Sequence, residues 1–120
     1  PDLRSWISFH TGAPFSAASA AVIAIGSWQD FTPLSAFPVG SAEYPDRSTT
    51  LITEVDLLGR EGSNACRLTG PGIQDFTTLC LSDPALMQAN TALFPLGLDF
   101  ILTSESSVAA LPRSTKIEVM

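Results

Sequence analysis

His10 is the only histidine of the chain, so a Ser-His-Asp or Cys-His set of nucleophile and base would have to be built around it. It stands directly before a Thr-Gly pair, and the sequence holds no Gly-x-Ser-x-Gly elbow that would present a serine nucleophile. A histidine in this setting is usually a hydrogen-bonded structural residue; a contact with another subunit or with a ligand is the alternative. The sequence therefore predicts no catalytic residue, and His10 is a candidate interface or ligand residue.

Gly70 and Gly72 are the second candidates, because glycines allow backbone N–H groups to converge on a phosphate. The turn lacks the spacing and the Lys-Ser/Thr ending of a P-loop, and Pro71 between the glycines has no N–H to donate. A tight turn at the end of a strand would use the same residues. Both interpretations stay open at this point: an anion-binding turn, or a turn without a ligand.

Arg67 lies three residues before this turn. Its guanidinium could meet a phosphate held by the glycines, or it could pair with Glu54 or Asp56 across a hairpin. The first alternative makes Arg67 a ligand residue, and the second makes it part of the fold.

Asp99 lies in an apolar run, where a buried carboxylate is costly unless it is paired. Arg113 is the predicted partner, because it ends the next hairpin arm and a planar guanidinium can bind a carboxylate through two N–H groups. Such a pair would hold the strand geometry or contact a neighbouring subunit. Asp99 and Arg113 are therefore candidate interface residues and not catalytic ones.

The remaining reactive side chains predict no cofactor and no metal site. Cys66 and Cys80 have no nearby His or Cys partner, so we expect both to be reduced and packed in the core. Lys116, the only lysine, lies in an alternating segment beside Glu118, which argues against a Schiff base with pyridoxal phosphate. No cluster of His, Asp and Glu has the spacing of metal ligands.

Length and charge limit the possible partners. The 120 residues predict a single domain, with a net charge of -6 and six scattered basic residues. Nucleic acid and anionic membranes need clustered cations, so neither is an expected partner. The apolar run at 17–25 is too short to span a bilayer, and we expect a cytoplasmic protein. A hydrophobic content of 45% indicates that part of the surface is covered by another chain.

Periodicity and turn residues predict the elements of the first half. A helix or extended lead-in ends before Gly12, and the apolar run over 20–25 predicts a strand buried on both faces. A short helix follows, with Asp30 or Thr32 at its cap and Pro33 in its first turn, and 39–48 form a loop. Alternation over 51–58 predicts a half-buried strand with one apolar face, formed by Leu51, Val55 and Leu57.

The second half continues with two predicted hairpins and a helix. The turn at 59–64 joins the strand over 51–58 to one over 65–69, and a turn at 105–107 joins strands over 98–103 and 108–111. Asp83-Pro84 opens the helix between the hairpins, and 115–119 form a final edge strand. The predicted buried stripe of that helix consists of Leu86, Ala89 or Asn90, and Leu93. Strands interleaved with helices indicate an α/β fold with a mixed sheet and flanking helices.

Four stretches of the sequence resemble stretches of one known family, and they follow one another in the same order as in that family. They are 6–14 (Trp-Ile-Ser-Phe-His-Thr-Gly-Ala-Pro), 67–73 (Arg-Leu-Thr-Gly-Pro-Gly-Ile), 94–103 (Phe-Pro-Leu-Gly-Leu-Asp-Phe-Ile-Leu-Thr) and 111–119 (Leu-Pro-Arg-Ser-Thr-Lys-Ile-Glu-Val). The chain is similar to the C-terminal part of the PhnH family, a core subunit of bacterial carbon-phosphorus lyase. The resemblance implies a single PhnH-like domain over 1–120 that lacks the family's N-terminal region. It also implies a fold like the large domain of pyridoxal phosphate dependent transferases, without the cofactor site.

The resemblance implies a role in phosphonate catabolism. We expect a noncatalytic accessory subunit that supports formation of alpha-D-ribose 1-methylphosphonate 5-triphosphate from ATP and methylphosphonate. The implied partners are the subunits PhnG, PhnI, PhnJ and PhnL and a second copy of the chain in a homodimer. The alternative is a subunit that itself binds nucleotide or phosphonate at a shared interface, through Arg67, His10 and the turn at 70–72. The chain has no catalytic set of its own, and as a subunit of a multi-subunit transferase and lyase system it is not assigned as an enzyme or a non-enzyme by its sequence.

Overall fold

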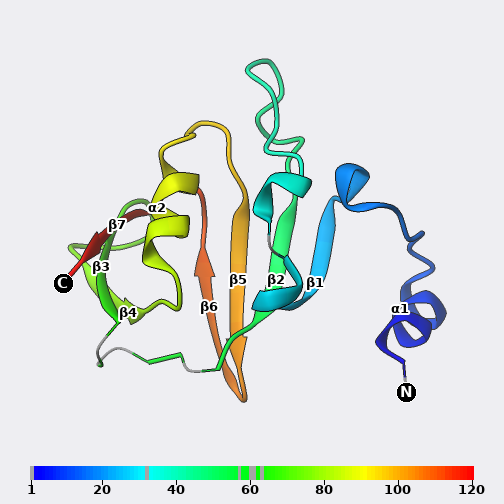
Figure 1. Cartoon of the computed structure of the whole chain (residues 1–120), viewed down its shortest axis with the longest axis horizontal. Helices are drawn as coiled ribbons and strands as arrows, with labels where there is room; N and C mark the ends of the chain where they lie inside the picture. Colours follow the sequence, from blue (N-terminus) through cyan, green and yellow to red (C-terminus); the bar gives the residue numbers. More distant parts are fainter. Residues whose placement is uncertain (1, 32, 57, 60–61, 63) are drawn as a thin grey trace.

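A four-stranded mixed sheet forms the centre of the molecule in a computed structural model of the chain (Figure 1). The structure describes residues 2–31, 33–56, 58–59, 62 and 64–120. The strands of this sheet are β1 (Ile23–Ser27), β2 (Thr50–Glu54), β5 (Asp99–Ser104) and β6 (Ser107–Leu111), in the order β1-β2-β5-β6. The first three run parallel and β6 is antiparallel to β5. The predicted α/β class with a mixed sheet is confirmed.

A second sheet of three antiparallel strands lies beside the first (Figure 1). Its strands are β3 (Ala65–Thr69), β4 (Thr77–Cys80) and β7 (Lys116–Val119), in the order β4-β3-β7. The prediction of a hairpin between the strands over 51–58 and 65–69 is therefore wrong. Both edges of β2 are occupied by β1 and β5, so β3 has no free edge of β2 to pair with. Parts of the predicted turn at 59–64 lie outside the described residues.

The hairpin formed by β5 and β6 and the edge position of β7 are as predicted. The outer edge of β7 is covered by the helix α2 (Pro84–Thr91), since Gln88 Nε2 donates to the Ile117 carbonyl at 2.9 Å and Thr91 Oγ1 donates to the Thr115 carbonyl at 3.0 Å. Side-chain donors thus occupy carbonyl groups that an edge strand would otherwise leave open.

The cap of α2 is as predicted, and the segment before Gly12, which the sequence left open as helix or extended, is a helix. Asp83 accepts a hydrogen bond from the N–H of Leu86 and Pro84 occupies the first turn of α2. The helix α1 (Leu3–Thr11) is capped by Asp2, which accepts from Arg4 N–H, and ends at Gly12 in the left-handed conformation. Met87 and Asn90 are the buried residues of α2, whereas Leu93 is exposed, so the predicted stripe of Leu86, Ala89 or Asn90, and Leu93 is only partly right.

The helix predicted after β1 is replaced by two short 3₁₀ helices over Trp28–Phe31 and Leu34–Ala36, with Pro33 before the second. Asp30 lies inside the first and accepts hydrogen bonds from the N–H and hydroxyl of Ser27. Thr32 is outside the described residues. The loop predicted over 39–48 is present, closed by a bridge between Val39 and Ser48. None of the helices in the described ranges is long and apolar enough to cross a bilayer.

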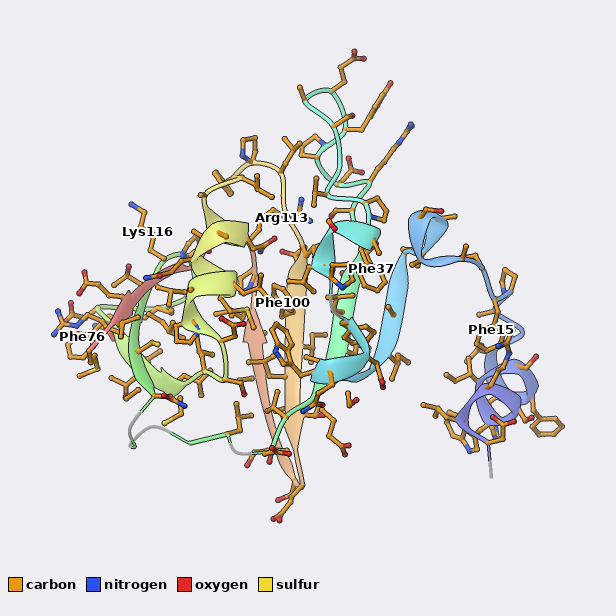
Figure 2. All side chains as sticks on the ribbon, in the orientation of Figure 1. Phe15, Phe37, Phe76, Phe100, Arg113 and Lys116 are labelled. Atoms are coloured by element: carbon orange, nitrogen blue, oxygen red, sulfur yellow. The ribbon has the colours of Figure 1, made fainter. Side chains whose placement is uncertain are left out.

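The core lies between one face of the four-stranded sheet and the elements that cover it. Leu51, Phe100 and Leu102 point from that face toward α2, the three-stranded sheet and the 3₁₀ segments. Figure 2 shows Phe100 at the centre and Phe37 above β1 and β2. The members of the core are Phe31, Leu51, Cys66, Leu68, Leu81, Met87, Leu98, Phe100, Leu102 and Leu111.

Two sequence expectations about strands need correction. The strand over 20–25 was expected to be buried on both faces, but β1 is an edge strand and its Ile23 and Ile25 are 59% and 46% exposed. The strand over 51–58 is shorter than predicted and ends at Glu54, with Leu51 and Thr53 buried. Val55, just beyond it, is half-buried and packs against the core, in agreement with the predicted apolar face. Leu57 lies outside the described residues.

Candidate functional site

Arg113, labelled in Figure 2, makes more side-chain hydrogen bonds than any other residue in the described part of the chain. Its Nη2 donates to Asp99 Oδ2 at 2.7 Å and its Nε donates to Asp99 Oδ1 at 3.2 Å. Its Nη1 donates to the Pro45 carbonyl at 2.6 Å, and its Nη2 also contacts the Ser48 hydroxyl. The backbone N–H of Arg113 adds a bond of 2.8 Å to Asp99 Oδ1. The predicted pairing of Asp99 with Arg113 is confirmed.

The electrostatics of Asp99 follow from this geometry. Burial by itself would raise the pKa of the Asp99 carboxyl, but the hydrogen bonds from the Arg113 side chain and backbone and the guanidinium charge outweigh it and hold the pKa below its ordinary value. The carboxylate therefore stays ionised and occupied by donors. It is suited to fixing the start of β5 against the 39–48 loop and not to accepting a proton in catalysis.

The segment before β5 is held by a second polar contact that the sequence did not indicate. Asn90, buried in α2, accepts a hydrogen bond from Leu98 N–H and donates one to the Leu98 carbonyl, both at 2.8 Å. Gly97 has a φ of +135°, and a Cβ there would lie 3.2 Å from the Asn90 carbonyl oxygen. Only glycine fits this close approach without strain. The signal that could have found this contact is Asn90 in the predicted buried stripe of the helix, because a buried amide needs hydrogen-bond partners.

Ser48 and Pro45 are the other site residues that sequence reasoning missed. They precede β2, and Arg113 reaches them across 65 and 68 positions of sequence. No local pattern marks a serine hydroxyl or a carbonyl as the acceptor of so distant an arginine. The cluster lies where the parallel strands begin, so it joins the loop before β2 to the start of β5.

Arg67 lies on β3, three residues before the glycine turn that follows this strand. The β3 register sets Arg67 opposite Thr78 and Glu118, and its guanidinium stacks 4.4 Å from the centre of the Phe76 ring. The predicted pairing of Arg67 with Glu54 or Asp56 is therefore wrong, because β3 does not pair with β2. Its side chain is exposed.

The turn at 70–72 has the backbone of a tight turn. Gly70 has a φ of +144° and Gly72 a φ of +86°, and the Ile73 N–H is bonded to the Gly70 carbonyl at 3.1 Å. A Cβ on Gly70 would lie 3.1 Å from the Ser114 carbonyl oxygen, so the glycine allows the turn to pack against the residues after β6. This requirement explains Gly70 without a ligand.

His10 is far from both groups. It lies in the last turn of α1, on the opposite side of the molecule from β3, and the centre of its ring lies 4.3 Å from that of Trp6 and 5.0 Å from that of Phe9. All three side chains are exposed. The structure thus brings Asp99 to Arg113, stacks Arg67 on Phe76, and places His10 on the other side of the molecule.

The two cysteines are free and buried, as predicted. Burial raises the pKa of the Cys66 thiol, and the neighbouring Cys80 raises it further, so the thiol is a poor nucleophile. Among the residues that the structure describes, no three His, Cys, Asp or Glu side chains gather where they could hold a metal ion.

Comparison with known proteins gives the chain its context. The profile of the bacterial phosphonate metabolism protein family (PhnH) matches residues 1–118. The alpha-D-ribose 1-methylphosphonate 5-triphosphate synthase subunit PhnH of Rhizobium meliloti (strain 1021) is 39% identical over 126 residues, which cover 94% of this chain and 59% of the relative. A second relative is HtxG of Stutzerimonas stutzeri, which is provisionally named as a C-P lyase subunit protein. It is 44% identical over 86 residues, which cover 68% of this chain and 43% of that relative.

The chain spans roughly half of the length of these curated relatives, 59% of one and 43% of the other. The family match nevertheless runs through all the elements described above, from α1 to β7. The chain belongs to the PhnH family of bacterial phosphonate metabolism proteins.

Proposed function

We propose that the chain acts as a noncatalytic accessory subunit of the carbon-phosphorus lyase core complex. It would support formation of alpha-D-ribose 1-methylphosphonate 5-triphosphate from ATP and methylphosphonate, in the cytoplasm. The name of the Rhizobium meliloti relative supports this reaction for that protein. The chain's own contribution would be surface for its partners, because Asp99 and Arg113, its strongest polar pair, are occupied by each other and by neighbouring backbone.

The observation that carries the proposal is the amount of large apolar surface left bare. Phe9 is 86% exposed, Val22 73% and Trp6 60%. Scattered exposed apolar residues are ordinary, but here they gather on α1 and on β1 with the residue before it, at one side of the molecule. Interfaces between subunits are enriched in aromatic side chains of this kind.

The partners in this proposal are PhnG, PhnI, PhnJ and PhnL, together with a second copy of the chain. Phe76, Val119 and Met120 provide a second exposed apolar group at the opposite side of the molecule, on β7 and the turn before β4. Two separated apolar groups allow one chain to contact two partners at once. A homodimer that also binds other subunits is consistent with this arrangement.

Arg67 keeps the alternative function open. Its exposed guanidinium stacks on Phe76 beside the turn at 70–72, and an arginine held in this way can still donate to a phosphate or phosphonate through its edge. His10 would have to come from another chain, since it lies on the other side of the molecule. The alternative is therefore an anion site completed at a shared interface.

The likeness to the large domain of pyridoxal phosphate dependent transferases remains part of the proposal. The parallel β1, β2 and β5 with a crossover between each pair support it. Lys116 is exposed at the start of the edge strand β7, which is a poor environment for a Schiff base because nothing desolvates the amine. We propose that no such cofactor is bound.

A reconstitution experiment separates the two functions. The chain is mixed with PhnG, PhnI, PhnJ and PhnL from the same source, assembly is followed by native mass spectrometry, and product formation is assayed. The accessory role predicts incorporation in a defined ratio and unchanged product formation with Arg67→Ala and His10→Ala. Arg47→Ala is a matched control, because Arg47 also stacks on an exposed ring, that of Tyr44, at 3.8 Å.

The alternative gives a different result. If Arg67→Ala lowers product formation by about tenfold, the value of one charge-assisted hydrogen bond, while Arg47→Ala and assembly are unaffected, the chain binds the substrate directly. Failure of the chain to join any of these subunits would contradict both functions.

A further inference from the structure

The second face of the four-stranded sheet carries a row of apolar side chains between polar ends. We call it the open face; its apolar residues are Ile23, Ile25, Ile52, Ile101, Val108 and Ala110, and its polar residues are Ser27, Thr50, Glu54, Asp99 and Thr103. The strand register places Ile25, Ile52, Ile101 and Ala110 side by side in one row across all four strands. Ile23 is 59% exposed and Val108 is 69% exposed.

An apolar row across the middle of the open face is unexpected for a sheet of this kind. Parallel strands are normally covered on both faces, whereas a sheet with one face in water alternates apolar and polar residues. Here β2 and β5 carry Leu51 and Phe100 toward the core and Ile52 and Ile101 toward the open face. The apolar residues of this row are therefore typical of a sheet face that other elements cover.

The edge strand beside this face is also unprotected. Within the described part of the chain, β1 pairs with β2 alone, so the N–H and C=O groups of its outer edge have no strand partner. It carries no charged residue and no proline, the usual devices that protect an edge. The outer edge of β7, in contrast, receives hydrogen bonds from Gln88 and Thr91 of α2.

The helix α1 is the third bare element in this region. It lies beyond the β1 edge, away from both sheets, and has no buried residue (Figure 1). Leu3, Trp6 and Phe9 are 55%, 60% and 86% exposed. A helix of 9 residues is marginal in water without packing, even with both ends capped. Its apolar side chains therefore need a partner surface.

We propose that the open face, the β1 edge and α1 form one docking surface for the polypeptide that the longer relatives carry outside the matched region. That segment would pair with β1, cover the row of Ile25, Ile52, Ile101 and Ala110 with amphipathic helix, and bury Trp6 of α1. The proposal concerns how the fold is completed: it assigns the bare surface of α1 and β1 to this segment and leaves Phe76, Val119 and Met120 for the partner subunits of the proposed function.

The relatives supply the length that this surface needs. The match covers 59% of the Rhizobium meliloti protein, so about two-fifths of that chain lies outside it. Helix-bearing crossovers cover the second face of other parallel sheets, and each needs about a dozen residues or more. A second copy fits less well, because pairing of two β1 edges would extend the sheet and leave the open face bare.

The test uses the whole chain and one defined probe, the part of the Rhizobium meliloti PhnH outside the matched region. The probe is added as a separate polypeptide and, in a second arm, fused ahead of residue 1. Binding is measured by native mass spectrometry and by hydrogen exchange of the β1 amides. We expect a one-to-one complex, slowed exchange over Ile23–Ser27, and a blue shift of fluorescence that Trp6→Phe removes.

Two matched variants identify the surface. Ile23→Glu places a charge on the open face, and Val119→Glu places one on β7 at the same exposed fraction of 59%. Both sites are exposed, so both variants should fold, which circular dichroism checks. We expect Ile23→Glu to weaken binding by about tenfold or more and Val119→Glu to leave it unchanged, because only the first carboxylate loses water on docking.

Three results would overturn the proposal. The first is an equal effect of the two glutamate variants on binding. The second is rapid exchange of the β1 amides in both the mixture and the fusion. The third is a dimer of the chain alone that Ile23→Glu splits and Val119→Glu does not, because a second copy would then be the occupant of this surface.

Discussion

The two faces of the four-stranded sheet carry similar residues in very different surroundings. On the covered face Leu51, Phe100 and Leu102 are at most 1% exposed, while on the open face Ile23 and Ile25 remain 59% and 46% exposed. The strands, and therefore the hydrogen bonds between them, are the same for both faces. An apolar side chain stabilises the fold in proportion to the surface it removes from water. Side chains of similar type on the two faces therefore contribute differently, because elements pack over only one face.

The largest expected effect comes from neighbouring residues of β5 on the two faces. Phe100→Ala should lower the free energy of unfolding by about 3–5 kcal/mol, because it removes a buried ring and leaves a cavity. Ile101→Ala, one position further on the open face, should cost only about 1 kcal/mol. Urea denaturation followed by circular dichroism measures both. Equal losses would mean that the open face is covered in solution.

The second prediction concerns the polar end of the open face, where β5 begins. Asp99→Asn should lower the free energy of unfolding at pH 7 by about 2 kcal/mol, because the hydrogen bonds of Arg113 then lose their charged acceptor. Ser48→Ala is the control that removes one contact of Arg113 without removing a titrating group.

The pH dependence of this difference has a definite sign. The pKa of Asp99 is lowered in the folded protein, so its stabilisation is complete above the unfolded pKa, about 3.9, and is lost as the pH falls through the lower folded value. The gap between the native chain and Asp99→Asn should therefore be constant from pH 7 to about pH 5 and shrink below about pH 4. A gap that persists at acid pH would contradict the ion pair.

The third prediction compares two buried threonines near the covered face. Thr53 and Thr49 are both fully buried, but Thr49 Oγ1 donates to the Ala21 carbonyl at 2.6 Å, whereas Thr53 Oγ1 has no hydrogen-bond partner among the described residues. Thr53→Val should raise the free energy of unfolding by about 1 kcal/mol, and Thr49→Val should lower it by about the same amount. Thermal denaturation of the pair gives both values, and a loss in Thr53→Val would reveal a missed acceptor.

The smallest effect is expected for Ile52→Thr, in the row of the open face. In the chain alone it should change the free energy of unfolding by less than about 0.5 kcal/mol, since threonine also favours strands and little buried area is lost. Chemical denaturation with and without the covering segment measures the change. The effect should grow when that segment is present, and an unchanged small effect would count against coverage of this row.

Local signals predicted several elements well. Asp83 and Pro84 mark the start of α2, because Asp caps a helix and Pro suits its first turn. The hairpin of β5 and β6 can be predicted from its alternating residues and the turn at Glu105. The Asp99 and Arg113 pair was also within reach, because one lies at the start of β5 and the other just after β6. These features depend on residues close in sequence, where hydrogen-bonding groups meet without a long loop.

Strand partners beyond one hairpin were not predictable in the same way. The sequence paired the strands over 51–58 and 65–69 because a turn lies between them, yet β2 pairs with β1 and β5, and β3 pairs with β4 and β7. Two alternating strands joined by turn residues fit either arrangement. Their periodicity does not show that β5, which begins 45 residues after the end of β2, pairs with the edge of β2 that a hairpin with β3 would need.

The sequence by itself determined the α/β class, the capped helices and the identity of the charged pair, because each rests on local periodicity or on the cost of burying one carboxylate. Only the tertiary structure decided that β1 is an edge strand, that Arg113 reaches Ser48 and Pro45, and that Arg67 stacks on Phe76. The pattern of an alternating or apolar strand indicates which residues are buried. The elements that bury them are decided by contacts between segments that are distant in sequence.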